Sequence, residues 1–166
     1  MRRPRSRRAR RPVPTPSQRR AARQYLRNGT TNLFAALQVH SGKVSGMTAP
    51  TRNRWDFLAF LQQLEGETPA ERKIVAICDN LSTHKTKEVQ EWLAEHPRWQ
   101  MVFTPKHASW LNQVEIFFSI LTRRLLRHGQ FTGPQDLATQ MLAFVEHHNL
   151  TAQPFAWTYT GKVLTA

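Results

Sequence analysis

Asp79 is the first of two acidic side chains that stand out as candidates for chemistry. It follows the apolar run of residues 73–78, which has the composition of a buried parallel strand. In open α/β sheets, functional groups gather at the carboxyl ends of strands. An Asx turn made by Asp79 or Asn80, leading to the next helix, explains the same pattern equally well.

Glu115 is the second candidate, because it is an acid within an otherwise apolar segment. Asn112 and Ser119 lie three and four positions away and share its helical face, whereas Phe117 and Leu121 belong to the apolar stripe. A capping box, with Asn112 as the N-cap and Glu115 as the third helical residue, is the alternative, and the local pattern slightly favours it.

The segments that must position these acids alternate between strand-like and helix-like, which predicts an α/β fold. Residues 31–39 and 43–48 are expected to form an antiparallel hairpin around a turn at Ser41 and Gly42. A short strand is expected over residues 99–103, and helices over residues 54–64, 86–95, 112–128 and 134–148. The first of these helices has Trp55, Leu58 and Leu61 at core spacing.

The positive charge is concentrated in the first 27 residues. The chain has 24 Lys and Arg against 11 Asp and Glu, a net charge of +13, but eleven of the arginines and no acid fall in residues 1–27. With four prolines in the same stretch, these residues are expected to be a disordered arm that attracts phosphates. An organelle transit peptide, or translation from a wrong start or frame, gives the same composition.

Composition also excludes several classes of protein. The single cysteine, Cys78, rules out a disulfide framework and a cysteine-based zinc site, and it is interpreted as a small buried residue. No apolar run approaches the roughly 18 residues that a membrane helix requires. The cytoplasm is therefore the default location. His84, His147 and His148 have no partner at metal-ligand spacing.

Two separated blocks of the sequence resemble a known family. CDNLSTHK at residues 78–85 and PKHASWLNQVE at residues 105–115 resemble the second and third acidic motifs of DDE transposases. The resemblance is to the bacterial insertion-sequence branch of the mariner-like superfamily. It extends roughly from residue 20 to the end, and includes residues 29–37 and 154–161.

The resemblance implies a ribonuclease-H-like mixed sheet flanked by helices, in which three carboxylates hold two divalent ions, Mg²⁺ or Mn²⁺. By this resemblance Asp79 corresponds to the second acid and Glu115 to the third. Asn80 and Asn112 are interpreted as supporting groups because they lie next to the two motifs, and a simple cap or turn is the alternative for each. The implied partner is DNA, as transposon ends and target. A homodimer or pairing with an upstream transposase product is also implied, with no membrane and a location at the bacterial nucleoid.

The first acid of the family has no counterpart here. It lies on the opening strand of the domain, but the first acid of this chain is Asp56, which is expected in the first turn of a helix. The sequence therefore predicts an arm at 1–27, an incomplete catalytic domain at 28–150 without its first, central strand, and an extension at 151–166. We expect a truncated DNA strand-cleavage and strand-transfer domain with little activity alone. The alternative is a non-catalytic DNA-binding remnant or an inactive transposase subunit.

Basic side chains near the two acids are candidates for phosphate contacts, and ordinary solvated helix faces are the alternative interpretation. These candidates are Lys85, Lys87, Lys106, His107, Arg123, Arg124 and Arg127.

Overall fold

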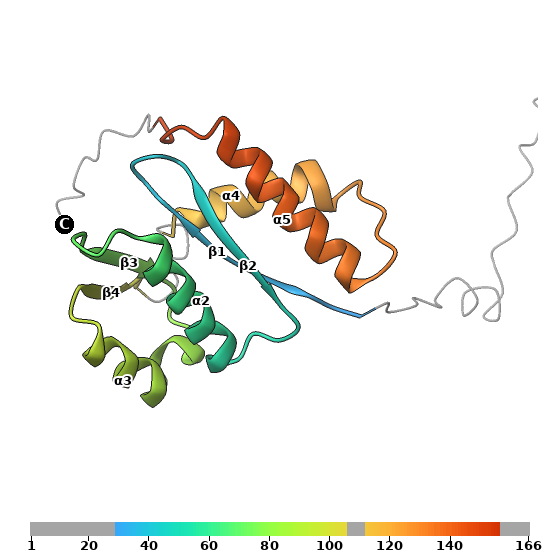
Figure 1. Cartoon of the computed structure of the whole chain (residues 1–166). Helices are drawn as coiled ribbons and strands as arrows, with labels where there is room; N and C mark the ends of the chain where they lie inside the picture. The colour runs from blue at the N-terminus through green and yellow to red at the C-terminus, as the bar shows by residue number, and fades with distance from the viewer. Residues whose placement is uncertain (1–28, 106–111, 157–166) are drawn as a thin grey trace, which may run out of the picture.

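The predicted hairpin is present in the structure, a computed structural model that describes residues 29–105 and 112–156 (Figure 1). Strands β1 (Asn32–Leu37) and β2 (Val44–Ala49) pair antiparallel, with Leu37 opposite Val44 beside the turn. Gly42 in this turn has a φ of +72°, a left-handed value that glycine adopts without the steric cost of a Cβ atom. A Cβ there would also lie 2.0 Å from the carbonyl oxygen of Gln153.

A second pair of strands forms a separate parallel sheet. Strands β3 (Ile74–Cys78) and β4 (Trp99–Phe103) are joined by the short 3₁₀ helix η1 (Ser82–Lys85) and helix α3 (Lys87–Glu95). The register pairs Ile74 with Trp99 and Cys78 with Phe103. Because the two strands are parallel and in step, both end at the same edge, where Asp79 and Thr104 follow them.

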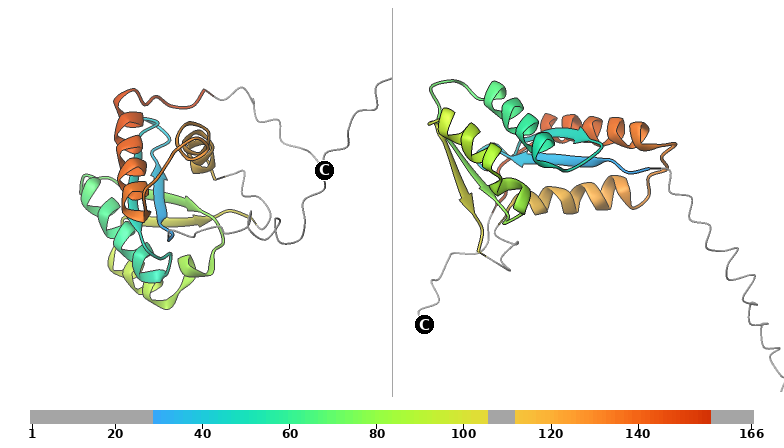
Figure 2. Two further views of the ribbon diagram at one scale, coloured as in Figure 1. Left: turned by 90° about the vertical axis from the view of Figure 1, so that its right-hand side faces the viewer. Right: turned by 90° about the horizontal axis from the view of Figure 1, so that it is seen from below.

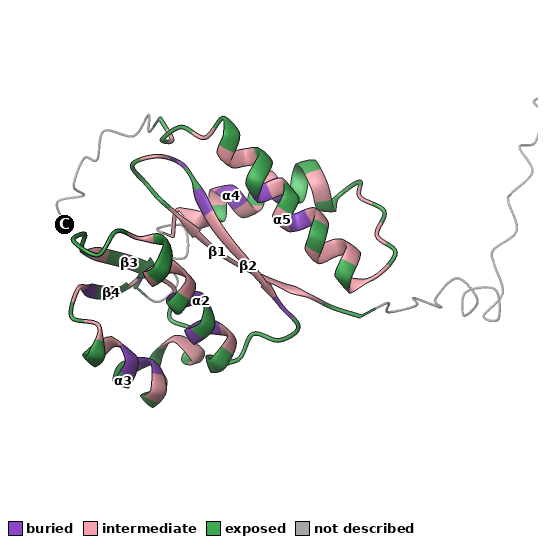
Figure 3. Ribbon diagram, viewed as in Figure 1, coloured by how far each residue is buried: buried purple, intermediate pink, exposed green. Residues whose placement is uncertain are grey.

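The expectation that β3 is a buried strand is wrong for one of its faces. Ile74 and Ala76 pack against a hydrophobic core, but Val75 and Ile77 are 59% and 52% exposed. Figure 3 shows exposed residues along this strand. Val102, which pairs with Ile77, is also exposed. The apolar sequence of β3 suits a strand covered on both sides, and among the described residues only one side is covered.

Helices lie on both faces of the hairpin (Figure 2). Phe34 of β1 packs on the core of helix α2 (Arg54–Glu67), and its ring lies 5.8 Å from that of Phe60. Alternate strand residues point to opposite faces, and Leu33 packs instead on a second core built around Val44, Phe117 and Val145. Helices α4 (Val114–Leu121) and α5 (Pro134–Leu150) supply this second core.

Two helices differ from the sequence prediction. The long helix expected over residues 112–128 is α4, which begins at Val114 and ends at Leu121, followed by a π-helical turn, η3 (Thr122–Leu126). In α2, Trp55 is 58% exposed instead of core-facing, and the buried side chains are those of Phe57, Leu58, Phe60 and Leu61.

Within residues 29–105 and 112–156, no helix has the length and apolar character needed to cross a membrane.

Candidate active site

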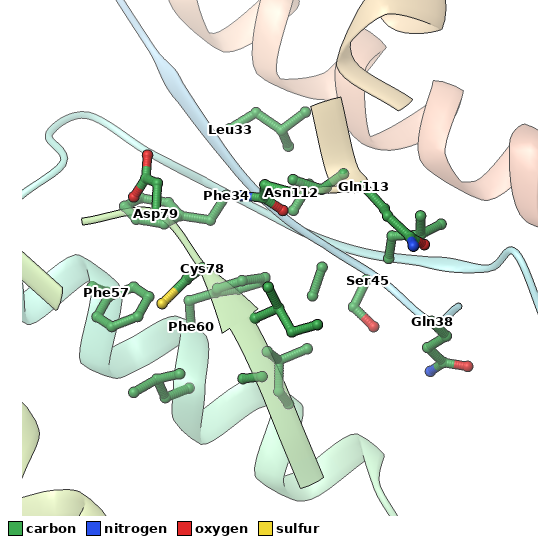
Figure 4. Close-up of a pocket in the computed structure, with 18 of the residues that line it drawn as sticks. Leu33, Phe34, Gln38, Ser45, Phe57, Phe60, Cys78, Asp79, Asn112 and Gln113 are labelled. Atoms are coloured by element: carbon green, nitrogen blue, oxygen red, sulfur yellow. The ribbon is translucent and has the colours of Figure 1, made fainter. Parts of the chain in front are cut away.

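A groove of about 1040 Å³ lies between the two sheets and contains both candidate acids. Its walls are β1, β3, and parts of α2 and α4. Asp79 and Glu115 both line it, although they are 36 positions apart in the sequence. Figure 4 shows Asp79 at the carboxyl end of β3, toward the same end of the groove as Asn112.

Asp79 makes the Asx turn that the sequence offered as an alternative, and it faces the groove as well. Its Oδ1 atom accepts a hydrogen bond from the backbone N–H of Leu81 at 3.4 Å. The same oxygen lies 3.2 Å from Nδ1 of His84. The side chain remains 40% exposed, so the turn does not remove the carboxylate from the groove.

His84 is a site residue that its spacing in the sequence did not reveal. The 3₁₀ helix η1 brings it back toward Asp79, five residues earlier, and its ring packs against that of Phe57 in a tilted arrangement, with 4.2 Å between ring centroids. The side chain is only 13% exposed. Because Nδ1 contacts both the carboxylate and the backbone carbonyl of Asp79, His84 restricts the orientation of that acid. The sequence signal that could have identified His84 is a histidine a short turn after an aspartate that ends a strand.

Asn80 ties the ends of β3 and β4 together. Its side-chain amide donates to the carbonyl of Thr104, and its oxygen accepts from Nζ of Lys85. The backbone N–H of buried Thr104 donates to the carbonyl of Cys78 at 2.9 Å. Lys85 also lies over the ring of Phe103, with Nζ 4.4 Å from the centroid. These contacts hold the loop that carries Asp79 against β4.

Cys78 lies directly before Asp79 and contributes to the groove wall. Burial, aided by the Asp79 carboxylate, raises the pKa of its thiol to about 11, although Lys85 acts in the opposite direction. The thiol is therefore neutral at physiological pH. Cys78 is half-buried, so the prediction of a buried residue is only partly met.

The capping box at Glu115 is not formed. The N-cap of α4 is Gln113, and it makes no side-chain cap hydrogen bond. The backbone N–H of Glu115 donates to the carbonyl of Asn112 at 3.1 Å, and the Glu115 side chain is exposed. Glu115 and Asn112 both line the groove. The capping alternative for Glu115 is therefore wrong.

A capping box is present at α2 instead. Oδ1 of Asn53 accepts from the backbone N–H of Trp55 and Asp56, and Oδ2 of Asp56 accepts from the backbone N–H of Asn53 at 3.2 Å. The interpretation of Asp56 as an ordinary first-turn aspartate is confirmed.

The candidate ligands are of the chemical type that binds a divalent cation, but there are only two of them among the described residues. Carboxylate oxygens are the ligands that Mg²⁺ and Mn²⁺ prefer, and Asp79 and Glu115 offer them on one groove. Within the described ranges, no group of three or more His, Cys, Asp or Glu is arranged to hold a metal ion.

The candidate phosphate contacts are at the surface wherever the structure describes them. Lys87 pairs with Glu91 at 3.2 Å, and Nε of Arg123 donates to the carbonyl of Ser119 at 3.3 Å. Arg124 and Arg127 are exposed. Lys106 and His107 lie outside the described residues, as do the arm and the end of the 151–166 extension.

The sequence matches a protein family and a bacterial insertion-element protein. A family described as DDE superfamily endonuclease matches residues 2–138. The chain is also 30% identical over 123 residues to a protein of Shigella sonnei named "Insertion element IS630 uncharacterized 39 kDa protein". That match covers 74% of this chain and 35% of the relative, so the chain spans about a third of the relative's length.

Proposed function

Because the chain belongs to the DDE superfamily endonucleases, we propose that it is the catalytic part of a DNA transposase. The reaction is divalent-metal-dependent cleavage of DNA strands and their transfer to a target. The observation that carries this proposal is the presence of Asp79 and Glu115 on one groove, in a family defined by endonuclease activity.

Asp79 and Glu115 are the proposed metal ligands, and Asn80 and Asn112 support them from neighbouring positions. A pair of Mg²⁺ or Mn²⁺ ions, when bound, would favour attack on the phosphodiester and stabilise the departing oxygen. The chain's own contribution is to hold the carboxylates ready. Contacts with His84 and with the backbone N–H of Leu81 hold the Oδ1 atom of Asp79 in place. They thereby also restrict the direction in which Oδ2 points. The contacts of Asn80 with Thr104 and Lys85 keep the supporting loop in place.

We further propose a ribonuclease-H-like sheet whose central strand, with the remaining carboxylate, comes from outside the described residues. The order of the described elements supports it: an antiparallel hairpin, then a parallel pair, with helices on both faces. The groove lies where a strand between β1 and β3 would run. The domain divisions at residues 27 and 150 follow the same proposal.

DNA is the proposed partner, in the form of element ends and target. Exposed basic residues on η1, α3 and η3 supply phosphate contacts, together with the arginine-rich arm. Association with the bacterial nucleoid follows from a DNA substrate. Dimerisation, or pairing with a longer transposase chain, belongs to the same proposal. The residues proposed for these phosphate contacts are Lys85, Lys87, Arg123, Arg124 and Arg127 among the described residues, and Lys106 and His107 outside them.

A second function, as a non-catalytic DNA-binding subunit, has one observation in its favour. Of the carboxylates that line the groove among the described residues, Glu67 is hydrogen-bonded to Ser45 and Gln63, so Asp79 and Glu115 are the two candidate ligands, whereas two-ion chemistry calls for a fuller set. In that case the chain binds DNA through its positive charge without cutting it.

Nicking of terminal-repeat DNA by the purified chain in Mg²⁺ or Mn²⁺ distinguishes these functions. We expect slow, metal-dependent nicking that falls by about 100-fold or more in Asp79→Ala and in Glu115→Ala. Glu146→Ala is the matched control, because Glu146 is an exposed helical glutamate on α5, and it should nick at the wild-type rate. Nicking that survives Asp79→Ala contradicts the assigned role. Binding without any nicking favours the non-catalytic subunit.

A further inference from the structure

A second, smaller pocket of about 450 Å³ lies where the start of α2 meets η1 and the start of α3. It is lined by Asn53, Arg54, Trp55, Ser82, Thr83 and Thr86. None of these residues lines the groove that contains the two candidate acids. The pocket is therefore a separate feature, and its volume falls in the range of about 300–1,000 Å³ that is typical of ligand sites.

Trp55 gives this pocket an aromatic wall. Its side chain is more than half exposed, although the sequence predicted that it would face the core. The other described tryptophans, Trp92 and Trp99, are buried, and no other aromatic side chain among the described residues is exposed. An indole offers a large flat apolar surface, so covering it with a flat ligand is favourable.

Arg54 places a positive charge beside this indole. The guanidinium carbon lies 5.2 Å from the centroid of the Trp55 ring, which is within the range of a cation–π contact. Its Nε atom pairs with Glu88 at 3.0 Å, and this ion pair ties the start of α2 to α3. A guanidinium has five N–H donors, and the ion pair uses the one on Nε. The side chain is also 46% exposed, so it is accessible to a ligand.

The backbone that carries Trp55 is fixed by a cap. Oδ1 of Asn53 accepts hydrogen bonds from the backbone N–H groups of Trp55 at 2.8 Å and of Asp56 at 3.0 Å. Nδ2 of Asn53 donates to Oγ1 of Thr51 at 2.8 Å, which holds the cap itself in place. A ligand that binds here therefore has little backbone to order, and preorganisation of this kind favours affinity.

The pocket and the groove are neighbours because η1 contributes to both. Ser82 and Thr83 line the pocket, whereas His84 lines the groove. Two residues after Trp55, Phe57 packs against the ring of His84, which in turn contacts Asp79. A polymer that lies in the groove at Asp79 can therefore place a neighbouring unit in the pocket.

A nucleobase has the chemistry that these walls recognise. Its flat face suits the indole of Trp55, and its hydrogen-bonding edge suits the hydroxyls of Ser82 and Thr83, which both donate and accept. The phosphate next to it suits the guanidinium of Arg54. Bases inside a duplex are stacked between their neighbours, so the base that reaches the pocket has to be unpaired.

We propose that this pocket binds one unpaired nucleobase of a DNA strand, stacked on Trp55, with Arg54 at the adjacent phosphate. The choice of DNA as the polymer rests on the proposed function. Stacking is tolerant of sequence, because every base has a flat face. The pocket therefore gives the chain a preference for DNA with an unpaired base over fully paired DNA, whichever base is unpaired.

Fluorescence anisotropy with two labelled duplexes tests this preference on the full chain, without added metal and with EDTA present. One duplex has a single extra thymine in the middle of one strand, and the other is fully paired and otherwise identical. Their charges are nearly equal, so the arginine-rich arm should bind both alike. We expect the duplex with the extra thymine to bind with a Kd at least about fivefold lower. Equal affinity of the wild type for both duplexes overturns the inference.

Substitution of Trp55 locates the site. Trp55→Ala should remove the preference and leave the Kd for the paired duplex within about twofold of wild type, whereas Trp55→Phe should keep part of the preference because it retains an aromatic face. Leu150→Ala is the matched control, because Leu150 is an exposed apolar residue at the end of α5, outside the pocket, and it should keep the full preference. A preference that survives Trp55→Ala, or an equal loss of affinity for both duplexes, overturns the inference.

A fluorescent base reports the stacking directly. With 2-aminopurine in place of the extra thymine, binding of wild type and of Leu150→Ala should quench its emission through the indole, and binding of Trp55→Ala should not. Quenching of the same size in all three proteins would place the base elsewhere and overturn the inference.

The nicking assay separates this inference from the proposed function. Metal-dependent nicking by a chain that shows no preference for the unpaired base contradicts the base pocket alone. A preference that depends on Trp55, in a chain that does not nick DNA, supports the base pocket and contradicts the catalytic function alone.

Discussion

At the scale of single residues, Asp79 combines a structural and a chemical position. The turn that its carboxylate forms with Leu81 was offered by the sequence as a rival to a functional role, and the structure places the same carboxylate on the groove. The two roles are compatible because a carboxylate has two oxygens with several lone pairs. The contact with His84 depends on how η1 folds, so spacing alone could not predict it.

Cys78 provides a residue-scale prediction. Its pKa is raised from 9.0 to about 11, so the thiolate fraction at pH 8 is about 100-fold lower than in the unfolded chain. Alkylation by iodoacetamide at pH 8 should therefore be about 100-fold slower in the folded chain than in urea. The folded rate should rise about tenfold for each pH unit up to roughly the pKa. A folded rate equal to that of the unfolded thiol means that Cys78 does not experience the burial described here.

At the scale of elements, Arg98 joins the end of α2 to the start of β4. Its Nε atom donates to both oxygens of Glu65, at 2.9 and 3.0 Å, and its other nitrogens donate to the carbonyls of residues 65, 68, 69 and 72. Nε1 of Trp99 donates to the same carboxylate at 2.6 Å. The network fixes where β3 and β4 lie on α2, and therefore where the groove opens.

This network predicts a pH dependence of stability. The hydrogen bond from Trp99, and then that from Arg98, lower the pKa of Glu65 below its ordinary value of 4.5. A lowered pKa in the folded state stabilises the protein above pH 4.5, and that contribution is lost as the pH falls through the folded value. Glu65→Gln should therefore reduce the free energy of unfolding most at pH 7, and the difference from wild type should shrink below pH 4.5.

Urea unfolding between pH 7 and pH 3 measures this difference. Glu71→Gln is the control, because Glu71 is an exposed glutamate in the loop before β3. If the difference in the free energy of unfolding between wild type and Glu65→Gln stays constant across this range, ionisation of the Glu65 carboxylate does not stabilise the fold.

Elements with local signals were predictable from the sequence. The hairpin follows from two runs rich in apolar and β-branched residues around the turn at Ser41 and Gly42, and β4 was predicted with the bounds that the structure has. Residues whose environment depends on distant segments were predicted less well. The exposure of Val75 depends on which strand lies beside β3, and the end of α4 at Leu121 depends on the π-helical turn after it. The prediction that Asp79 and Glu115 belong to one site came from the family resemblance, because the local pattern around either acid does not imply the other. Both residues line the same groove.

At the scale of the whole molecule, charge and architecture are divided between different parts of the chain. The described fold supplies the groove and its two candidate metal ligands, Asp79 and Glu115, while residues 1–27 carry eleven arginines without an acid. The rest of the chain has 13 basic and 11 acidic residues, a net charge of only +2. Electrostatic affinity for DNA should therefore come mainly from the arm.

Deletion of residues 1–27 tests this division. Each phosphate neutralised on duplex DNA contributes about 0.9 to the slope of log affinity against log salt concentration. If the arginines contact phosphates, the deletion should flatten this slope by several units and weaken binding most at low salt. Arg123→Ala and Arg124→Ala, together, should change the slope by no more than about 2. Fluorescence anisotropy on a terminal-repeat duplex between about 50 and 200 mM salt measures the slope. An unchanged slope after deletion would assign DNA binding to the folded domain instead, and the exposed arginines of η3 would then be the first residues to test.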